Sequence, residues 1–97
     1  GDRFMNRAEL INRITEKTGL KKKYTEDTLD ALLEVIQEAL VAGESVKIIG
    51  FGTFETRARK ERTGRNPQKP ETLIAIPASR APVFKAGKSL KDAVNKR

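Results

Sequence analysis

Residues 50–67 read GFGTFETRARKERTGRNP, and this stretch joins two kinds of side chain that cannot share one environment. Its first part holds Phe51 and Phe54, large apolar residues that favour a core. Gly50 and Gly52 flank Phe51, and glycine within a strand is typical of a bulge or a close backbone approach. A bulge would turn both rings to one face, where Phe84 would complete an aromatic core.

The second part, residues 55–63, is dominated by charged side chains and has no apolar face. Its side chains would alternate between two faces, one carrying Arg57 and Arg59 and the other Ala58, Lys60 and Arg62. Such a strand cannot pack on a core in the ordinary way. Turn residues follow at 63–67, and residues 72–76 read as a strand. We therefore predict a β-hairpin arm over about residues 55–76, with its tip near Arg65 to Pro67 and with marginal stability of its own.

The chain before this stretch predicts two helices. Asn6 and Glu9 have the spacing of a capping box, and Gly19 suits a helix end, so the first helix should span residues 6–18. The second should begin between Lys21 and Thr25, with Thr25 as the better N-cap, and should end before residue 43.

The remaining elements complete an α+β chain. Residues 46–49 read as a strand that precedes the Phe pair. Gly87 precedes a C-terminal helix of about two turns, with Leu90 and Val94 on its inner face. Residues 5–97 are expected to form a single domain, and residues 1–4 are either an artificial remnant or a natural extension.

Charge divides the chain into unlike halves. Residues 1–54 hold eight Lys/Arg and nine Asp/Glu, whereas residues 55–97 hold twelve Lys/Arg and four Asp/Glu. The overall net charge is +7, so almost all of the excess lies in the second half. This asymmetry predicts a polyanionic partner for that half.

Composition removes several classes of function. There is no Cys and no His, which excludes disulfides, Cys/His zinc sites and the commonest general base. No apolar run reaches the length of a membrane span. Nuclease metal sites need clustered carboxylates, which the second half does not offer. We therefore expect no enzyme activity, no metal, no cofactor, no small-molecule substrate and no membrane partner, and a cytoplasmic location.

The predicted arm suits a nucleic-acid groove by its width and its charge. Residues 57–69 hold six cations against the single carboxylate of Glu61. Neutralising phosphates gives affinity without sequence preference, and only Asn66 and the arginines are equipped to read bases. Spacing alone favours a simple turn role for Pro67.

The same block, GFGTFETRARKERTGRNP, closely resembles the signature of the bacterial HU/IHF family of DNA-bending proteins. The resemblance extends to MNRAELI at residues 5–11, IPAS at 76–79 and PVFKAGKSLKDAV at 82–94. It covers nearly everything from Met5 onward and is most similar to the homodimeric HU branch. It implies an intertwined dimer with a helical body, a three-stranded antiparallel sheet and a protruding β-hairpin arm in each chain.

The resemblance also implies a mechanism. Two arms would follow the minor groove of double-stranded DNA, and a proline at each tip would intercalate and kink the duplex, as in minor-groove wedge proteins, of which this family is an example. Pro67 matches that proline, which reverses the preference for a simple turn. The matched DNA-binding residues are Arg57, Arg59, Lys60, Arg62, Arg65, Asn66, Pro67, Lys69, Arg80, Arg7, Lys88 and Lys91. The matched dimer core is Phe51, Phe54 and Phe84.

The function expected from this resemblance is architectural. The protein would bend and compact duplex DNA without sequence preference, would favour bent, nicked or kinked DNA, and would lie on the bacterial nucleoid. Two alternatives stay open: an IHF-like, sequence-preferring subunit of a heterodimer, and a basic RNA-binding protein.

The chain departs from the family pattern just after the tip. Lys69 stands where Thr or Asn is usual, Pro70 stands where Gly is frequent, and the return to residue 76 is one residue longer. Because Pro70 cannot donate in a strand ladder, the descending strand should carry a bulge or begin only at about Thr72.

Overall fold

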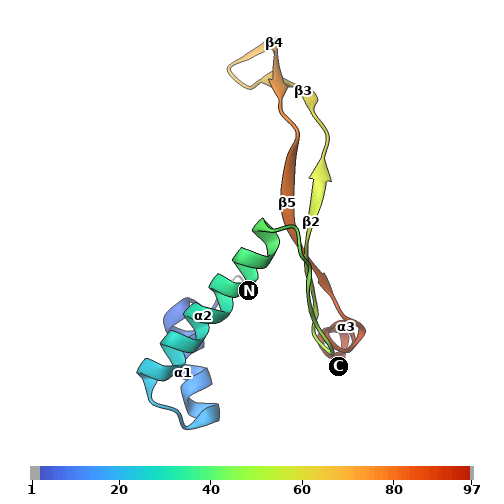
Figure 1. Ribbon diagram of the computed structural model, residues 1–97. Helices are drawn as coiled ribbons and strands as arrows, with labels where there is room; N and C mark the ends of the chain where they lie inside the picture. The colour runs from blue at the N-terminus through green and yellow to red at the C-terminus, as the bar shows by residue number, and fades with distance from the viewer. Residues whose placement is uncertain (1–2, 97) are drawn as a thin grey trace. The chain divides into compact units, whose positions relative to one another are not determined.

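The computed structural model describes residues 3–96. Along the chain the elements run α1, α2, β1, β2, β3, β4, β5 and α3 (Figure 1). The chain divides into two compact units, residues 1–38 and residues 39–97, and α2 continues from the first into the second. The expectation of a single domain over residues 5–97 stays a prediction.

The first helix, α1, spans Arg7–Thr18 as predicted from its end signals. The backbone N–H of Glu9 donates to Asn6 Oδ1 at 2.9 Å, which completes one half of the expected capping box. The Glu9 carboxylate forms an ion pair with Arg3, with 2.8 Å between Nη2 and Oε2. At the other end, Gly19 has a φ of 72°, and its N–H donates to the Thr15 carbonyl.

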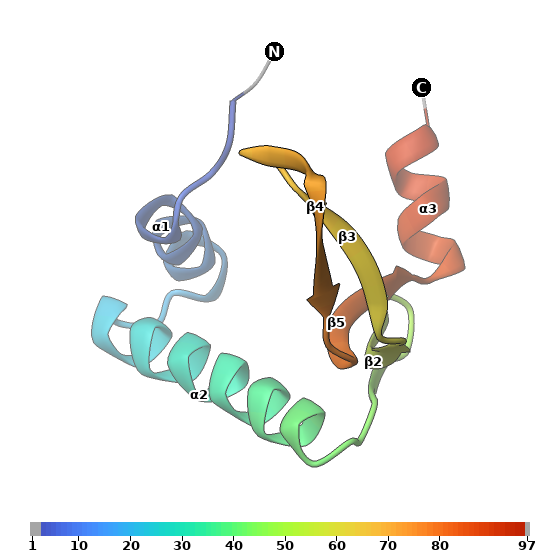
Figure 2. The ribbon, with the colours of Figure 1, turned by 90° about the horizontal axis from the view of Figure 1, so that it is seen from above.

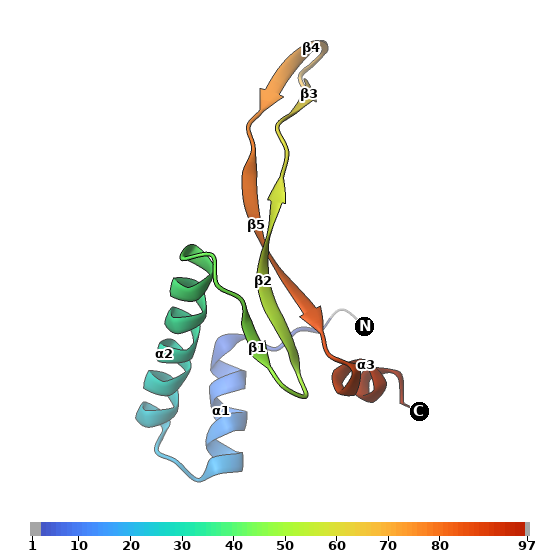
Figure 3. The same ribbon diagram turned by 45° about the vertical axis from the view of Figure 1, so that its right-hand side comes forward.

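The second helix, α2, spans Lys22–Val41, and within the first unit it lies beside α1 (Figure 3). Its start falls within the predicted range, but the preference for Thr25 as N-cap was wrong. Thr25 lies inside the helix and only 2% of it is exposed. The Thr15 hydroxyl of α1 donates to Thr25 Oγ1 at 3.2 Å, so packing between the helices places this residue.

A three-stranded antiparallel sheet has the order β1-β2-β5, from Val46–Ile48, Gly52–Arg59 and Ser79–Ala86. A tight turn joins β1 to β2, in which the Phe51 N–H donates to the Ile48 carbonyl at 3.0 Å. Gly50 takes a left-handed φ of 85° in this turn, where a side chain would be strained. The expected bulge between the two phenylalanines is therefore wrong, because Phe51 belongs to the turn.

The three aromatic rings nevertheless meet as predicted. The ring centroids of Phe54 and Phe84 lie 4.8 Å apart, and those of Phe51 and Phe84 lie 5.4 Å apart. Phe54 and Phe84 face each other across β2 and β5 in direct register. Phe51 and Phe84 remain 44% and 41% exposed, so this cluster is only half covered by its own chain.

The arm continues from the sheet as a two-stranded ribbon of β3, Arg62–Asn66, and β4, Lys69–Ile76 (Figures 1 and 2). A hairpin arm is present as predicted, but its returning side continues past residue 76 into β5, and Thr63 and Gly64 belong to a strand and not to the turn. The turn itself is Pro67–Gln68, which shares Pro67 with the predicted tip and extends one residue beyond it. The lower part of the arm is the paired stretch of β2 and β5 from Glu55↔Val83 to Arg59↔Ser79.

The last helix, α3, spans Lys88–Asn95. The Gly87 N–H, just before it, donates to the Phe51 carbonyl at 2.8 Å and so attaches the helix start to the β1–β2 turn. The prediction that Val94 lies on an inner face was wrong for the single chain, because Val94 is 75% exposed.

Few side chains are buried in the single chain. Among residues 3–96, Ile11 is the one buried large apolar residue, whereas Leu32, Leu33, Val35 and Ile49 are exposed. A chain of this size buries only part of its apolar surface on folding. The single chain therefore leaves much of its aromatic and leucine surface uncovered.

Candidate nucleic-acid interface

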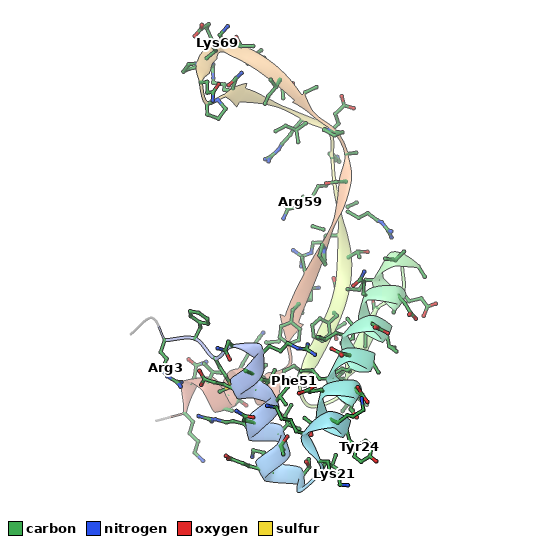
Figure 4. All side chains as sticks on the ribbon, turned by 90° about the vertical axis from the view of Figure 1, so that its left-hand side faces the viewer. Arg3, Lys21, Tyr24, Phe51, Arg59 and Lys69 are labelled. Atoms are coloured by element: carbon green, nitrogen blue, oxygen red, sulfur yellow. The ribbon has the colours of Figure 1, made fainter. Side chains whose placement is uncertain are left out.

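We call the paired part of β2 and β5, residues 55–59 with 79–83, the stem of the arm. Arg57 and Arg59 lie on one face of the stem, as alternation predicted, since β2 runs unbroken to Arg59. Both side chains are exposed, and Figure 4 shows Arg59 projecting from the ribbon. On the same face, Lys85 and Glu55 form an ion pair at 3.6 Å. The stem thus presents two neighbouring arginines to solvent.

A break separates the stem from the rest of the arm. Lys60 and Glu61 on one side, and Pro77 and Ala78 on the other, belong to no strand. Pro77 has no N–H to donate to a ladder, which is a physical reason for a gap here. The expected alternation of Ala58, Lys60 and Arg62 along one regular strand was therefore wrong. Arg62 begins a new pairing, opposite Ile76.

We call residues 62–76 the tip segment, and its turn is organised by Asn66. The backbone N–H of Gln68 donates to Asn66 Oδ1 at 2.9 Å, an Asx turn that spans Pro67. Asn66 and Lys69 face each other in the last pair of the ribbon. Pro67 therefore lies in the end turn of the arm, exposed, and close to Lys69, which Figure 4 labels there.

The predicted irregularity after the tip is confirmed. The register shifts between Arg65↔Leu73 and Asn66↔Lys69, so three residues of β4, Pro70 to Thr72, bulge out. The strand itself begins at Lys69 rather than at Thr72. The Arg65 guanidinium bridges the bulge, because its Nη1 donates to the Pro70 carbonyl at 2.8 Å. Arg65, expected as a DNA contact, is bonded to its own arm in the free chain.

Arg80 also makes a bond within the chain. It lies in β5 opposite Ala58, and its Nη2 donates to the Val41 carbonyl at 3.1 Å. Val41 is the last residue of α2.

Three expected phosphate contacts lie outside the arm. Lys88 and Lys91 are exposed on α3, in the same unit as the arm. Arg7 lies in the other unit, on α1, where its guanidinium forms an ion pair with Asp30 of α2. Arg7 must give up or share that partner to reach a phosphate.

Sequence reasoning missed the backbone partners of these side chains. Nothing in the residue types marks the carbonyls of Val41 and Pro70 as acceptors for arginine, because only the fold brings them close. The Asn66–Gln68 bond had a readable signal, since Asn before a proline turn commonly makes an Asx turn.

Over residues 3–96, no helix is long and apolar enough to cross a membrane. Within the same residues, no three acidic side chains gather where they could hold a metal ion.

The fold and the arm together define a class: a small basic α+β protein with a hairpin arm that bears cations along its stem and a proline at its end. A model of the family described as bacterial DNA-binding protein matches residues 5–95. The chain therefore belongs to this family of bacterial DNA-binding proteins, which are not enzymes. The predicted family resemblance is confirmed, including the preference for the HU branch.

Named relatives agree with this placement. The chain is 58% identical over 92 residues to DNA-binding protein HU of Clostridium pasteurianum, covering 95% of this chain and all of that protein. It is 53% identical over 90 residues to DNA-binding protein HU of Geobacillus stearothermophilus, covering 93% and 99%. Among solved structures, the Anabaena HU–DNA cocrystal structure matches with a TM-score of 0.89 and 44% identity, covering 96% of this chain and all of that one.

Proposed function

We propose that this protein is a homodimeric architectural DNA-binding protein that bends and compacts duplex DNA without strong sequence preference. The observation that carries the proposal is the arm, which has arginines exposed along the stem and Pro67 in its end turn. The Anabaena relative is described in complex with DNA, and its chain has the same fold as this one. A location on the bacterial nucleoid follows from this activity.

The proposed contacts divide by chemistry. The stem and tip cations would neutralise phosphates, which gives affinity independent of sequence. Pro67 has a rigid apolar ring and no N–H, so it would enter a base step as a wedge. Asn66 and Arg65 would flank it in the minor groove. The residues proposed to contact phosphates are Arg7, Arg57, Arg59, Lys60, Arg62, Lys69, Lys88 and Lys91.

The homodimer rests on uncovered apolar surface. Phe51 and Phe84 are close to half exposed, and Leu32 and Leu33 of α2 are exposed as well. Aromatic and leucine side chains of this kind are stabilised when a second chain covers them. We propose that two copies share one core built on Phe51, Phe54 and Phe84, and that each copy contributes one arm.

A preference for distorted DNA follows from the energy of bending. Bending a site of 20–30 base pairs costs about 1–6 kcal/mol, and unstacking a base step costs a few kcal/mol more. A nick, a gap or a junction lowers both costs. We therefore expect tighter binding to nicked and four-way-junction DNA than to a straight duplex of equal length.

A salt series on these three DNAs tests the proposal. If about eight phosphates are neutralised by the dimer, the logarithm of the binding constant should fall against that of the salt concentration with a slope near −7. A slope shallower than about −2 would contradict an interface that neutralises many phosphates. Two duplexes of scrambled sequence and a structured RNA competitor complete the series. Strong preference for one duplex would favour the IHF-like alternative, and preference for RNA would favour the RNA-binding one.

A further inference from the structure

Arg80 differs from the other cations of the stem in what it touches. Its Nη2 donates to the carbonyl oxygen of Val41, 39 residues earlier in the chain, at 3.1 Å. Within the described residues, Arg57 and Arg59 of the same stem make no side-chain hydrogen bond. Arg80 is therefore the stem cation whose guanidinium is already engaged.

The bonded carbonyl belongs to a helix end with a defined geometry. The Glu44 N–H donates to the Ala39 carbonyl at 2.8 Å, and the Gly43 N–H donates to the Leu40 carbonyl at 3.0 Å. With Gly43 at a φ of 82°, these two bonds form a Schellman motif at the end of α2. The motif satisfies the carbonyls of Ala39 and Leu40, and Arg80 supplies the donor for the next one.

Arg80 lies against this helix end rather than merely near it. A Cβ built on Gly43 would lie 3.5 Å from Arg80 Nη1, which is van der Waals contact. A positive charge there also complements the negative end of the helix dipole. The pair Gly43 and Arg80 thus joins the last turn of α2 to β5, and all of these residues belong to one compact unit.

The side of the ribbon on which Arg80 lies separates it from the other arginines. Arg80 pairs with Ala58, and so it shares a face with the Phe54–Phe84 pair, which lies four residues away along the strands. Arg57 and Arg59 lie on the opposite face. A duplex lying along the Arg57–Arg59 face would not meet the Arg80 guanidinium on the same side.

We propose that Arg80 is a positioning residue for DNA bending and not a phosphate ligand. It ties the stem of the arm to the last turn of α2, so that the stem keeps its direction when a bent duplex pulls on the tip. This inference rests on the proposed function, because a fixed stem matters only to a protein whose arms hold DNA under strain.

Two variants that each remove one stem arginine charge test the proposal: Arg80→Gln and Arg59→Gln. In the free protein, Arg80→Gln should speed hydrogen exchange of the Gly43 and Glu44 amides by about three- to tenfold, from loss of one hydrogen bond at the helix end. Arg59→Gln should leave both amides unchanged. Circular dichroism checks that each variant folds.

The DNA experiments use the same two variants. Arg59→Gln should make the salt slope shallower by about 0.9 for each phosphate that is no longer neutralised, whereas Arg80→Gln should keep the slope of the parent protein. At saturating protein, Arg80→Gln should lower the energy transfer between dyes on the two DNA ends, because the stem no longer holds one direction. A purely stabilising role would leave this transfer unchanged.

Three results would overturn the proposal: a change of slope for Arg80→Gln equal to that of Arg59→Gln, an unchanged DNA bend, or unchanged exchange at Gly43 and Glu44. Failure of the proposed function is a separate result. The parent protein would then leave the DNA straight, while the exchange comparison in free protein would still decide whether Arg80 holds the helix end.

Discussion

Two single residues, Gly52 in the sheet and Pro67 in the end turn of the arm, have contrasting roles in this chain. Gly52 is buried under Phe84, and a Cβ there would lie 2.5 Å from Phe84 Cζ and 2.6 Å from the Lys85 carbonyl. Pro67 is the opposite case, since it is exposed in the end turn of the arm and supports no core. The first residue should matter for stability and the second for function.

Gly52→Ala should therefore destabilise the fold. Overpacking against a ring and a backbone carbonyl costs about 1–3 kcal/mol, because the carbonyl cannot move aside as a flexible side chain can. Urea denaturation measures the change. Gly64→Ala is the matched control, since its Cβ would meet only the flexible end of Ile76 at 2.8 Å. Equal losses of stability for the two variants would show that the backbone contact is not the cause.

Pro67→Ala should leave the free energy of unfolding within about 1 kcal/mol of the parent, the size of a proline effect on the unfolded chain. It should reduce DNA bending, because alanine has no rigid ring to hold a base step open. Energy transfer between DNA end labels measures the bend, with Gln68→Ala as a control that keeps both the proline and the Asx-turn N–H. Identical DNA bend angles for Pro67→Ala and the parent would contradict the proposed role of Pro67 as a wedge.

Among the elements, the arm consists of two ribbons in series rather than one. The stem continues a ladder in which β2 and β5 pair over eight residues of each strand, and three of those in β2 also pair with β1. The tip segment pairs β3 with β4 beyond the break at Lys60–Glu61 and Pro77–Ala78, and no third strand of the described residues supports it. Two antiparallel strands alone are marginally stable in water.

We therefore expect the tip segment to open more readily than the sheet. In the free protein, amides of Thr63 and Ala75 should exchange at least about tenfold faster than those of Thr53 and Lys85, because local opening needs less energy where fewer contacts must break. Bound DNA should slow exchange in the tip segment more than in the sheet. Equal protection of both pairs in free protein would show that the break at Pro77 does not divide the arm.

At the scale of the whole molecule, a single chain does not have enough apolar surface of its own to cover its aromatic cluster. Phe54 contacts Phe84 within the chain, yet the exposed sides of Phe84 and Phe51 are left for another surface to cover. A core shared between two copies would make folding and association one process. Stability would then depend on protein concentration.

Two results should follow from a shared core. The melting temperature of the parent should rise with protein concentration. Phe54→Ala should lower the free energy of unfolding by about 3–5 kcal/mol, and the dimer should dissociate as the chains unfold. Calorimetry and light scattering measure both. Ile74→Ala, a truncation on the arm, should leave the oligomeric state unchanged. A stable folded monomer of Phe54→Ala would contradict the shared core.

Local signals explain which parts of the fold were predictable. Asn6 and Gly19 predicted the ends of α1 because helix caps act through neighbouring backbone groups. The charged strand after Phe54 predicted the arm because neither of its faces is apolar enough to be buried. Thr25 was misjudged as an N-cap because its hydroxyl is placed by Thr15 of another helix. The bulge expected at Phe51 was wrong because a turn at Gly50 achieves the same ring contact.

Residue order was therefore enough to establish an α+β chain with a basic hairpin arm, its proline, and an irregular strand after Lys69, since propensity, charge and turn chemistry are local properties. The tertiary structure decided which acceptors the arginines reach: Pro70 for Arg65 and Val41 for Arg80. Those partners are backbone carbonyls, which every residue carries, so no side-chain pattern distinguishes them. Only the path of the chain in space brings one carbonyl, and not another, to a guanidinium.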